Sequence, residues 1–156
     1  MLRTAISLSL FCLAPAMLFG AAKADDALEP SDLVGAYDIV SGEKYGVEEP
    51  KERIEGSTVR FTEDRVVVID KEEHEIYGAT YKLEPGGGDD GATVIKMVSK
   101  LAQNEDEVSF GLIEKKDDRV RLIYALPGAM RPADFKTKDK QLMFVLKKRA
   151  SAELDD

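Results

Sequence analysis

Apolar and polar residues alternate along most of this chain after residue 32, in short runs separated by turn residues. Such alternation places successive side chains on opposite faces of a β-strand. Together with one short run that is apolar throughout, it predicts strands at residues 35–43, 57–62, 65–70, 76–84, 93–99, 108–114, 119–125 and 141–148. Short strands at regular spacing predict an all-β fold. We expect an eight-stranded antiparallel up-and-down barrel, because closure leaves no strand edge exposed.

The alternation also predicts which side chains face the barrel interior. In the first strand Tyr37 and Ile39 share a face, and Tyr37 is the large inward anchor of that strand. In the last strand Phe144 faces inward, whereas Met143 and Val145 lie on the reverse face. The other positions expected to face inward are Val59, Phe61, Ala79, Tyr81, Leu83, Val120, Leu122, Tyr124, Leu142 and Leu146.

Two strands are apolar on both faces. Residues 66–69 read Val-Val-Val-Ile, and Met143 and Val145 make the reverse face of the last strand apolar too. An exposed apolar patch normally marks a contact, so we expect a short helix, the C-terminal tail or a second copy of the chain to cover it. The tail is small and acidic, and the one helical candidate, near Val98, is short. Homodimerisation is therefore the favoured cover.

The connections between strands carry their own signals. Ser31 and Asp32 predict the start of a short helical turn ahead of the first strand. Residues 45–55 form a polar connector in which Pro50 disfavours both helix and central strand. Residues 93–99 also fit a helical spacing, but their β-branched start favours a strand with a helical turn after it.

Residues 1–24 have the pattern of a secretion signal. A positive charge at Arg3 precedes an apolar run, and Ala22-Lys23-Ala24 has the small-x-small pattern of a peptidase site. The run is shorter than the roughly 18 residues expected of a membrane span. Cys12 suggests a lipoprotein, but Phe11 before it is unlike the small residue that such a signal requires. We expect an exported protein, periplasmic or extracellular, without a membrane span.

Composition narrows the class of partner. The single cysteine lies in the signal, so the mature chain has no thiol and uses no disulfide. The chain holds 22 basic and 30 acidic residues, a net charge of −8, and the charged residues of the signal are all basic. Such acidity argues against binding to nucleic acid or to anionic membranes. We divide the chain into a signal at 1–24, a linker at 25–31, one barrel domain at 32–149 and a flexible acidic tail at 150–156.

Few residues are suited to catalysis or to metal binding. His74 is the sole histidine, and no other ligands are spaced to join it. Asp89 and Asp90 lie in a glycine-rich loop at residues 85–91 that lacks the ligand spacing of a calcium loop. The other carboxylates lie mostly in turns, where solvated charges are expected. We therefore predict no metal, no cofactor and no enzymatic activity.

Four aromatic residues and one arginine are the candidate ligand-binding residues. The aromatic candidates are Tyr81, Phe110, Tyr124 and Phe144. They either line a pocket or form an ordinary core, because a barrel of about eight strands is only just wide enough for one small ligand. Arg131 lies in a stiff, proline-flanked crossover, where its guanidinium either clamps a ligand carboxylate at the barrel mouth or pairs with a neighbouring carboxylate or backbone carbonyl, with Phe135 plugging the barrel beside it.

Several short motifs follow one another in a distinctive order. They are Leu33-Val34-Gly35-Ala36-Tyr37, Thr80-Tyr81-Lys82-Leu83-Glu84-Pro85, Pro127-Gly128, Arg131-Pro132-x-x-Phe135 and Val145-Leu146-Lys147-Lys148-Arg149. In order and spacing they resemble an uncharacterised family of secreted lipocalin-like domains of planctomycete bacteria. The resemblance spans about residues 32–149. Because that family has no established activity, the resemblance implies an architecture and an address only.

The resemblance also implies a structural anchor at the closed end of the barrel. In lipocalin-like proteins a tryptophan of the first strand usually packs under an arginine that closes the last strand. Tyr37 stands at the tryptophan position, and Lys148 or Arg149 stands at the arginine position. Ile113 departs from the pattern, since the family often has tyrosine there.

The predicted barrel favours non-catalytic binding of a small, partly apolar or carboxylate-bearing molecule in its interior. The alternative is a filled barrel that acts as an envelope or protein-interaction module through its outer face. A pocket of about a few hundred Å³ favours the binder, and a filled interior favours the module.

Export generates the first prediction. The mature protein, isolated from its native host, should begin directly after Ala24, because the small-x-small pattern ends there, with cleavage after Ala22 as the second choice. N-terminal sequencing of the secreted form checks this. A chain that begins at Met1 would contradict it.

Overall fold

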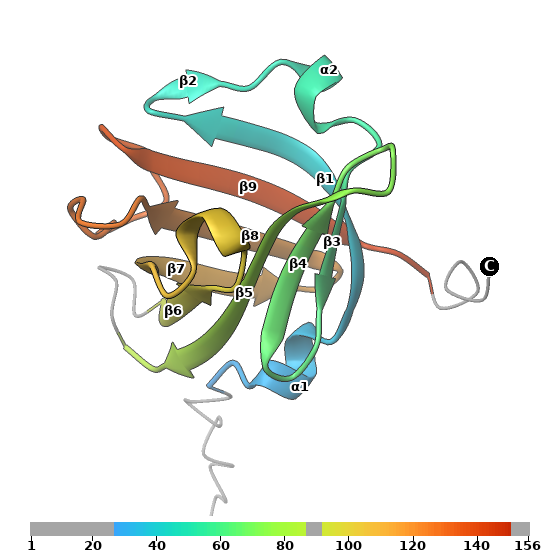
Figure 1. Ribbon diagram of the computed structural model, residues 1–156. Coiled ribbons are helices and arrows are strands. Elements are labelled where there is room, and N and C mark those ends of the chain that lie inside the picture. Colours follow the sequence, from blue (N-terminus) through green and yellow to red (C-terminus); the bar gives the residue numbers. More distant parts are fainter. Residues whose placement is uncertain (1–26, 87–91, 151–156) are drawn as a thin grey trace, which may run out of the picture.

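Nine strands form one antiparallel sheet in the computed structural model, which describes residues 27–86 and 92–150 (Figure 1). The strands are β1 (Gly35–Lys44), β2 (Val47–Glu48), β3 (Thr58–Phe61), β4 (Arg65–Ile69), β5 (Glu75–Glu84), β6 (Thr93–Ser99), β7 (Val108–Lys116), β8 (Arg119–Ala125) and β9 (Gln141–Lys148). They pair in the order β2-β1-β3-β4-β5-β6-β7-β8-β9, and β1 also pairs with β9. The sheet is thus a closed eight-stranded up-and-down barrel with β2 as an extra strand, which confirms the predicted fold class.

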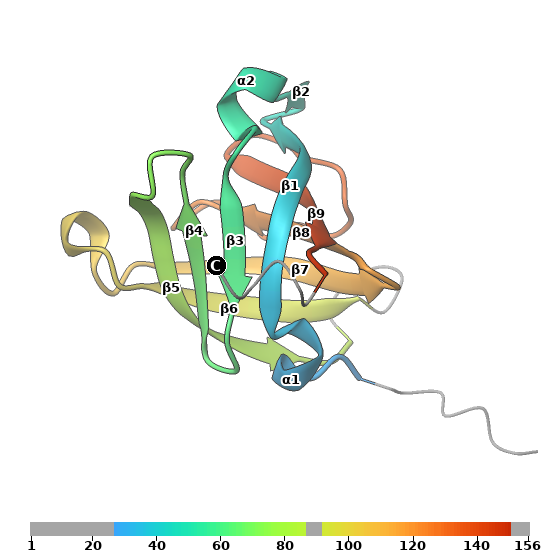
Figure 2. The same cartoon turned by 90° about the vertical axis from the view of Figure 1, so that its right-hand side faces the viewer.

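Three short helical segments accompany the barrel: α1 (Pro30–Leu33), α2 (Lys51–Ile54) and the 3₁₀ turn η1 (Ala102–Asn104). Figure 2 shows α1 at one end of β1 and α2 with β2 at the other. Leu33 of α1 is completely buried in the core, so α1 closes its end of the barrel. Within the described residues, no helix has the length and apolar character needed to cross a membrane.

The two expected connectors at the start of the domain differ from the prediction. The first helical turn begins at Pro30 rather than at Ser31, and the Glu29 amide donates to Asp32 Oδ2 at 2.9 Å. The predicted polar connector at 45–55 contains both β2 and α2. Tyr45 and Gly46 both have positive φ and make the two-residue hairpin turn, whose twist matches that of paired strands.

Pro50 does not exclude a helix, because it stands directly before α2, where a proline removes no helical hydrogen bond. The proposed signal at 1–24, the loop residues 87–91 and the tail at 151–156 lie outside the described residues.

An irregularity in β1 changes which residues face the interior. Its pairing with β9 slips between Ile39 and Ser41, so Val40 is an extra residue in the strand. Gly42 therefore faces Phe144, and the Phe144 ring lies 3.0 Å from the place where a Gly42 Cβ would be. A simple alternation from Ile39 would have placed Ser41 inside. The bulge therefore places Gly42, which has no side chain, opposite the large Phe144 ring.

One half of the barrel interior is filled by aromatic rings. The Tyr37 and Phe61 rings meet edge to face at 5.6 Å, and the Phe61 and Tyr81 rings meet the same way at 5.7 Å. The Tyr37 hydroxyl donates to the Leu33 carbonyl at 2.8 Å, and the Tyr81 hydroxyl donates to the Thr62 carbonyl at 2.6 Å. These buried hydroxyls are thus satisfied within the protein, as stable cores require.

The predicted basic partners do not stack on the Tyr37 ring. Lys148 pairs with Tyr37 across the strands, but its Cε lies 2.9 Å from where a Gly35 Cβ would be. In the described part of the chain it makes no cation–aromatic contact with Tyr37. Arg149 Nε donates to Asp38 Oδ1 at 2.8 Å. The absence of a side chain at Gly35 therefore leaves room for the Lys148 side chain.

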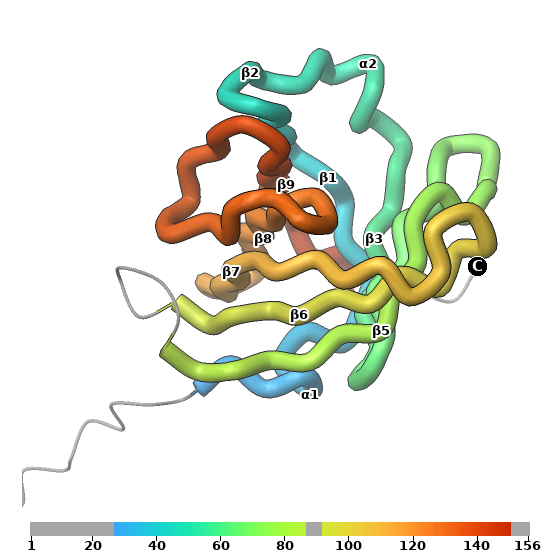
Figure 3. Tube along the Cα trace, turned by 60° about the vertical axis from the view of Figure 1, so that its left-hand side comes forward, coloured from blue at the N-terminus to red at the C-terminus, as the bar shows by residue number. Residues whose placement is uncertain are grey.

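The crossover at residues 126–140, orange in Figure 3, joins β8 to β9 and packs outside the barrel. The Arg121 guanidinium lies 4.3 Å from the centre of the Phe135 ring, so Phe135 does not plug the barrel. Ile123 faces outward, opposite Met143, and is nevertheless completely buried.

The apolar outer residues Val67, Ile69, Met143 and Val145 are half-buried within the chain itself. Less apolar surface is thus left for a second copy than the alternation alone implied. Homodimerisation stays a prediction, which sedimentation of the mature protein would test.

The closed end generates a stability prediction. Tyr37→Ala should lower the free energy of unfolding by about 3–5 kcal/mol, because a completely buried ring is removed and a void remains. Tyr37→Phe should lower it by only about 1 kcal/mol, because the ring stays and one hydrogen bond to Leu33 is lost. Denaturant titration of both variants measures the two losses. An unchanged midpoint for Tyr37→Ala would show that the ring carries no core packing.

Candidate functional site

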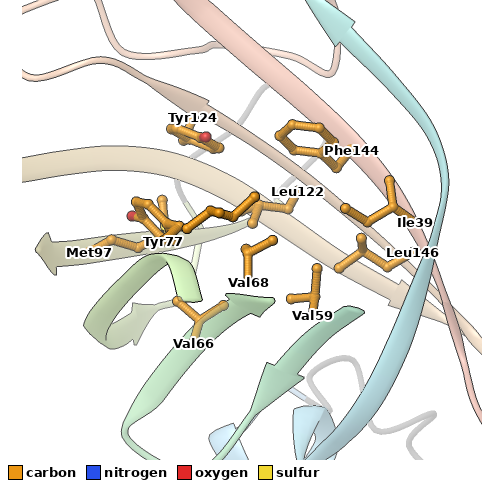
Figure 4. Close-up of a pocket in the computed structure, with 11 residues that line it drawn as sticks. Ile39, Val59, Val66, Val68, Tyr77, Met97, Leu122, Tyr124, Phe144 and Leu146 are labelled. Atoms are coloured by element: carbon orange, nitrogen blue, oxygen red, sulfur yellow. The ribbon is translucent and has the colours of Figure 1, made fainter. Parts of the chain in front are cut away.

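The other half of the barrel encloses a cavity of about 230 Å³. Eleven residues from seven strands line it, and Figure 4 shows them converging on one space. They are Ile39, Val59, Val66, Val68, Ile76, Tyr77, Met97, Leu122, Tyr124, Phe144 and Leu146. Ile76 is 53% exposed although it lines the cavity, which places it where the cavity meets solvent.

Local sequence explains why this half is hollow. Most of the lining side chains are valine, isoleucine, leucine or methionine, which project less far than the rings that fill the closed half. Gly42 and Gly111 face Phe144 and Tyr124 across neighbouring strands and contribute no side chain. A Cβ at Gly111 would lie 2.9 Å from Tyr124 Cβ and closer still to the Ile123 carbonyl. Glycine therefore permits the large rings to pack against bare backbone.

Three aromatic rings that line the cavity are neighbours in space. The Tyr77 and Tyr124 rings are 6.3 Å apart between centres and inclined by 26°. The Tyr124 and Phe144 rings are 6.5 Å apart and inclined by 28°. Tyr77 comes from β5, whereas the other two come from β8 and β9, so barrel closure brings these rings together.

The lining carries few polar atoms. The Tyr77 hydroxyl lies 3.6 Å from Met97 Sδ, a weak acceptor. The Tyr124 hydroxyl has no hydrogen-bond partner in the described part of the chain. Burial raises the pKa of Tyr77 to about 12. Burial also raises the pKa of Tyr124, still further, with smaller contributions from Tyr77 and Tyr45.

Two of the predicted ligand-binding residues, Tyr124 and Phe144, line the cavity. Tyr81 is buried in the filled half, where its hydroxyl is already paired with Thr62. Tyr77 was not singled out from the sequence. It occupies the same alternating row as Tyr81, so the strand pattern contains the signal for it.

Phe110 and Arg131 lie outside the barrel, which corrects the prediction of both as pocket residues. Phe110 pairs with Lys96, whereas Gly111 next to it pairs with the buried Ile95. Alternation therefore turns Phe110 outward. The Arg131 guanidinium lies 3.5 Å from the centre of the Phe110 ring, a cation–π contact. Arg131 thus clamps no carboxylate at the cavity mouth.

Among residues 27–86 and 92–150, no three His, Cys, Asp or Glu side chains converge in a way that could hold a metal ion. His74 is exposed, and its Nδ1 lies 3.6 Å from Asp70 Oδ2. The predicted loop carboxylates Asp89 and Asp90 lie outside the described residues.

No family model, curated protein or solved structure matches this chain. The resemblance to secreted lipocalin-like domains therefore stays a prediction from the motifs. The barrel itself rests on the strand pairing.

The buried tyrosines predict a loss of stability at alkaline pH. Burial raises the pKa of Tyr37, Tyr77 and Tyr81 from 10.0 to about 12. Below pH 10 both the folded and the unfolded state keep these protons, so the stability is fully present. Between about pH 10 and 12 the unfolded state releases them first, and the free energy of unfolding should fall as pH rises.

Tyrosinate absorbance separates this effect from lysine titration, which occurs in the same range. In the folded protein the buried tyrosines should ionise only near pH 12 or together with unfolding. Ionisation of all tyrosines near pH 10, with the denaturant midpoint unchanged, would contradict the prediction.

Proposed function

We propose that this protein binds a small apolar molecule non-catalytically in the hollow half of its barrel. The observation that carries the proposal is the cavity of about 230 Å³, whose wall consists of aliphatic side chains, one methionine and three aromatic rings. Burial of an apolar molecule against such a wall contributes about 25 cal/mol for each Å² removed from water.

The volume limits the size of the molecule. An apolar cavity of about 150 Å³ is large enough to hold benzene, whereas pockets for drug-sized compounds usually measure about 300–1,000 Å³. A cavity of about 230 Å³ therefore suits a compound of one or two rings, or an aliphatic compound of similar volume. A long lipid would not fit inside.

The chemistry of the lining supports binding rather than catalysis. Among residues 27–86 and 92–150, no carboxylate, histidine, lysine or arginine lines the cavity. General acid–base catalysis works best with a group whose pKa lies near the working pH, and the buried tyrosines are shifted away from neutrality. The rival function, a filled barrel that acts only through its outer face, is disfavoured by the open half.

The secreted lipocalin-like character predicted from the motifs fits this proposal, because an exported barrel would meet small molecules outside the cytoplasm. The expected export signal and the resemblance remain part of the proposal. The ligand of the native host can be sought by native mass spectrometry of protein purified from that host.

A cavity-filling variant tests the proposal. Val68→Phe should weaken binding of indole at least tenfold, because Val68 lines the cavity and the larger side chain occupies its volume. The matched control is Val67→Phe on the same strand, since Val67 is half-buried, does not line the cavity and pairs with Arg60 and Gly78. The chain contains no tryptophan, so indole fluorescence can be excited without protein background.

Thermal unfolding without ligand checks that both variants fold. The proposal fails if wild type neither binds indole nor is stabilised by it. It also fails if Val67→Phe and Val68→Phe weaken binding equally, because the bound indole would then lie outside the cavity.

A further inference from the structure

The polar atoms of the cavity lining belong to two tyrosines. Of the eleven lining side chains, only Tyr77 and Tyr124 carry an oxygen. The Tyr77 hydroxyl is directed at Met97 Sδ, 3.6 Å away. The Tyr124 hydroxyl has no hydrogen-bond partner within residues 27–86 and 92–150. The two tyrosines are thus chemically alike, but only the Tyr77 hydroxyl has an acceptor within the described part of the protein.

An unpaired hydroxyl in an apolar site is costly, and native proteins rarely leave one without a partner. The closed half of the same barrel follows this rule, because Tyr37 and Tyr81 both donate to backbone carbonyls. Tyr124 lines the cavity and makes no such bond (Figure 4). Among the described residues no fully buried side-chain polar atom lacks a partner, so the Tyr124 hydroxyl opens onto solvent-accessible space, where it can exchange water for a ligand. A molecule that enters the cavity can supply the missing acceptor.

The charge of the ligand is constrained by the same lining. In the part of the chain that the structure describes, no positively charged side chain lines the cavity to balance an anion, and no carboxylate lines it to balance a cation. Transfer of an unpaired charge into an apolar site costs far more than transfer of a neutral polar group. Burial raises the pKa of both lining tyrosines, so they remain neutral donors over the physiological pH range. Arg131, which the sequence suggested as a carboxylate clamp, lies on Phe110 outside the barrel.

The three aromatic rings that line the cavity favour a flat ligand. The Tyr124 ring is inclined by 26° to the Tyr77 ring and by 28° to the Phe144 ring, and all three rings line the cavity. Aromatic faces pack well against other flat apolar groups, in offset-stacked or edge-to-face arrangements. Tyr124 is the middle ring of the three, so a flat ligand that packs against these rings has the Tyr124 hydroxyl within reach.

We propose that the cavity selects uncharged aromatic compounds of one or two rings that carry a hydrogen-bond acceptor, and that the Tyr124 hydroxyl donates to this acceptor. This inference rests on the proposed function, since it names the ligand class of the same cavity. Carboxylate-bearing ligands are excluded from that class, in contrast to the expectation from the sequence. Tyr124 is the residue that determines specificity, and the aliphatic lining supplies most of the affinity.

Three compounds of nearly the same shape test the ligand class. Acetophenone is neutral and carries a carbonyl acceptor, α-methylstyrene replaces that oxygen with a CH₂ group, and benzoate carries a charge. The wild-type protein should bind acetophenone and α-methylstyrene in calorimetric titration. It should bind benzoate at least tenfold more weakly than acetophenone. Binding of benzoate as tight as that of acetophenone would overturn the exclusion of charge.

Two tyrosine variants test the role of the hydroxyl. Tyr124→Phe should reduce the preference for acetophenone over α-methylstyrene by about fivefold, the effect of one net hydrogen bond. Tyr77→Phe is the matched control and should leave that preference unchanged, because the Tyr77 hydroxyl is directed at Met97. Neither variant should have a lower unfolding midpoint by more than a few degrees, because each keeps its ring and loses no strong hydrogen bond.

The outcomes separate the two proposals. If wild type binds both neutral compounds and Tyr124→Phe leaves their ratio unchanged, the role of Tyr124 is refuted while cavity binding stands. If Tyr77→Phe changes the ratio as much as Tyr124→Phe does, the assignment of the donor to Tyr124 is also refuted. If wild type binds none of these compounds, and indole does not bind either, both proposals fail.

Discussion

The pairing of β1 with β9 is the constraint on which the rest of this structure depends. It closes the sheet, so every barrel strand has one row of side chains inside and one row outside. The slip in this pairing around Val40 adjusts the inward row of β1, because it brings Gly42 rather than a larger residue opposite Phe144. The β1–β9 pairing therefore encloses the interior, and its slip determines how much of the interior the side chains of β1 fill.

The interior is divided by side-chain volume. Rings at Tyr37, Phe61 and Tyr81 interlock edge to face and fill the end that α1 covers. Branched aliphatic side chains and two glycines leave the other end hollow. The same division holds for polar groups, since the tyrosine hydroxyls of the filled end donate to backbone carbonyls whereas that of Tyr124 does not. One half thus serves stability, and the other is available for a ligand.

Much of this arrangement was predictable from the alternation alone. The eight barrel strands and the inward positions of Tyr124 and Phe144 follow from a period of two, which is a local property of the chain. The hairpin and helix within residues 45–55 were missed, because a Tyr-Gly turn is a weaker signal than Asn-Gly and a proline was weighed against helix. The outward positions of Phe110 and Arg131 were missed because an aromatic and a guanidinium fit a pocket as well as an outer surface.

The sequence by itself determined the number and order of the barrel strands and the face to which most apolar side chains belong, because each depends on residues close together in the chain. Only the tertiary structure decided where the interior is empty, which lining tyrosine has no hydrogen-bond partner among the described residues, and on which ring the Arg131 guanidinium packs. These features depend on the register between strands distant in sequence. A shift of one residue in that register exchanges the inner and outer rows, and the alternation of a single strand carries no information about its neighbour's register.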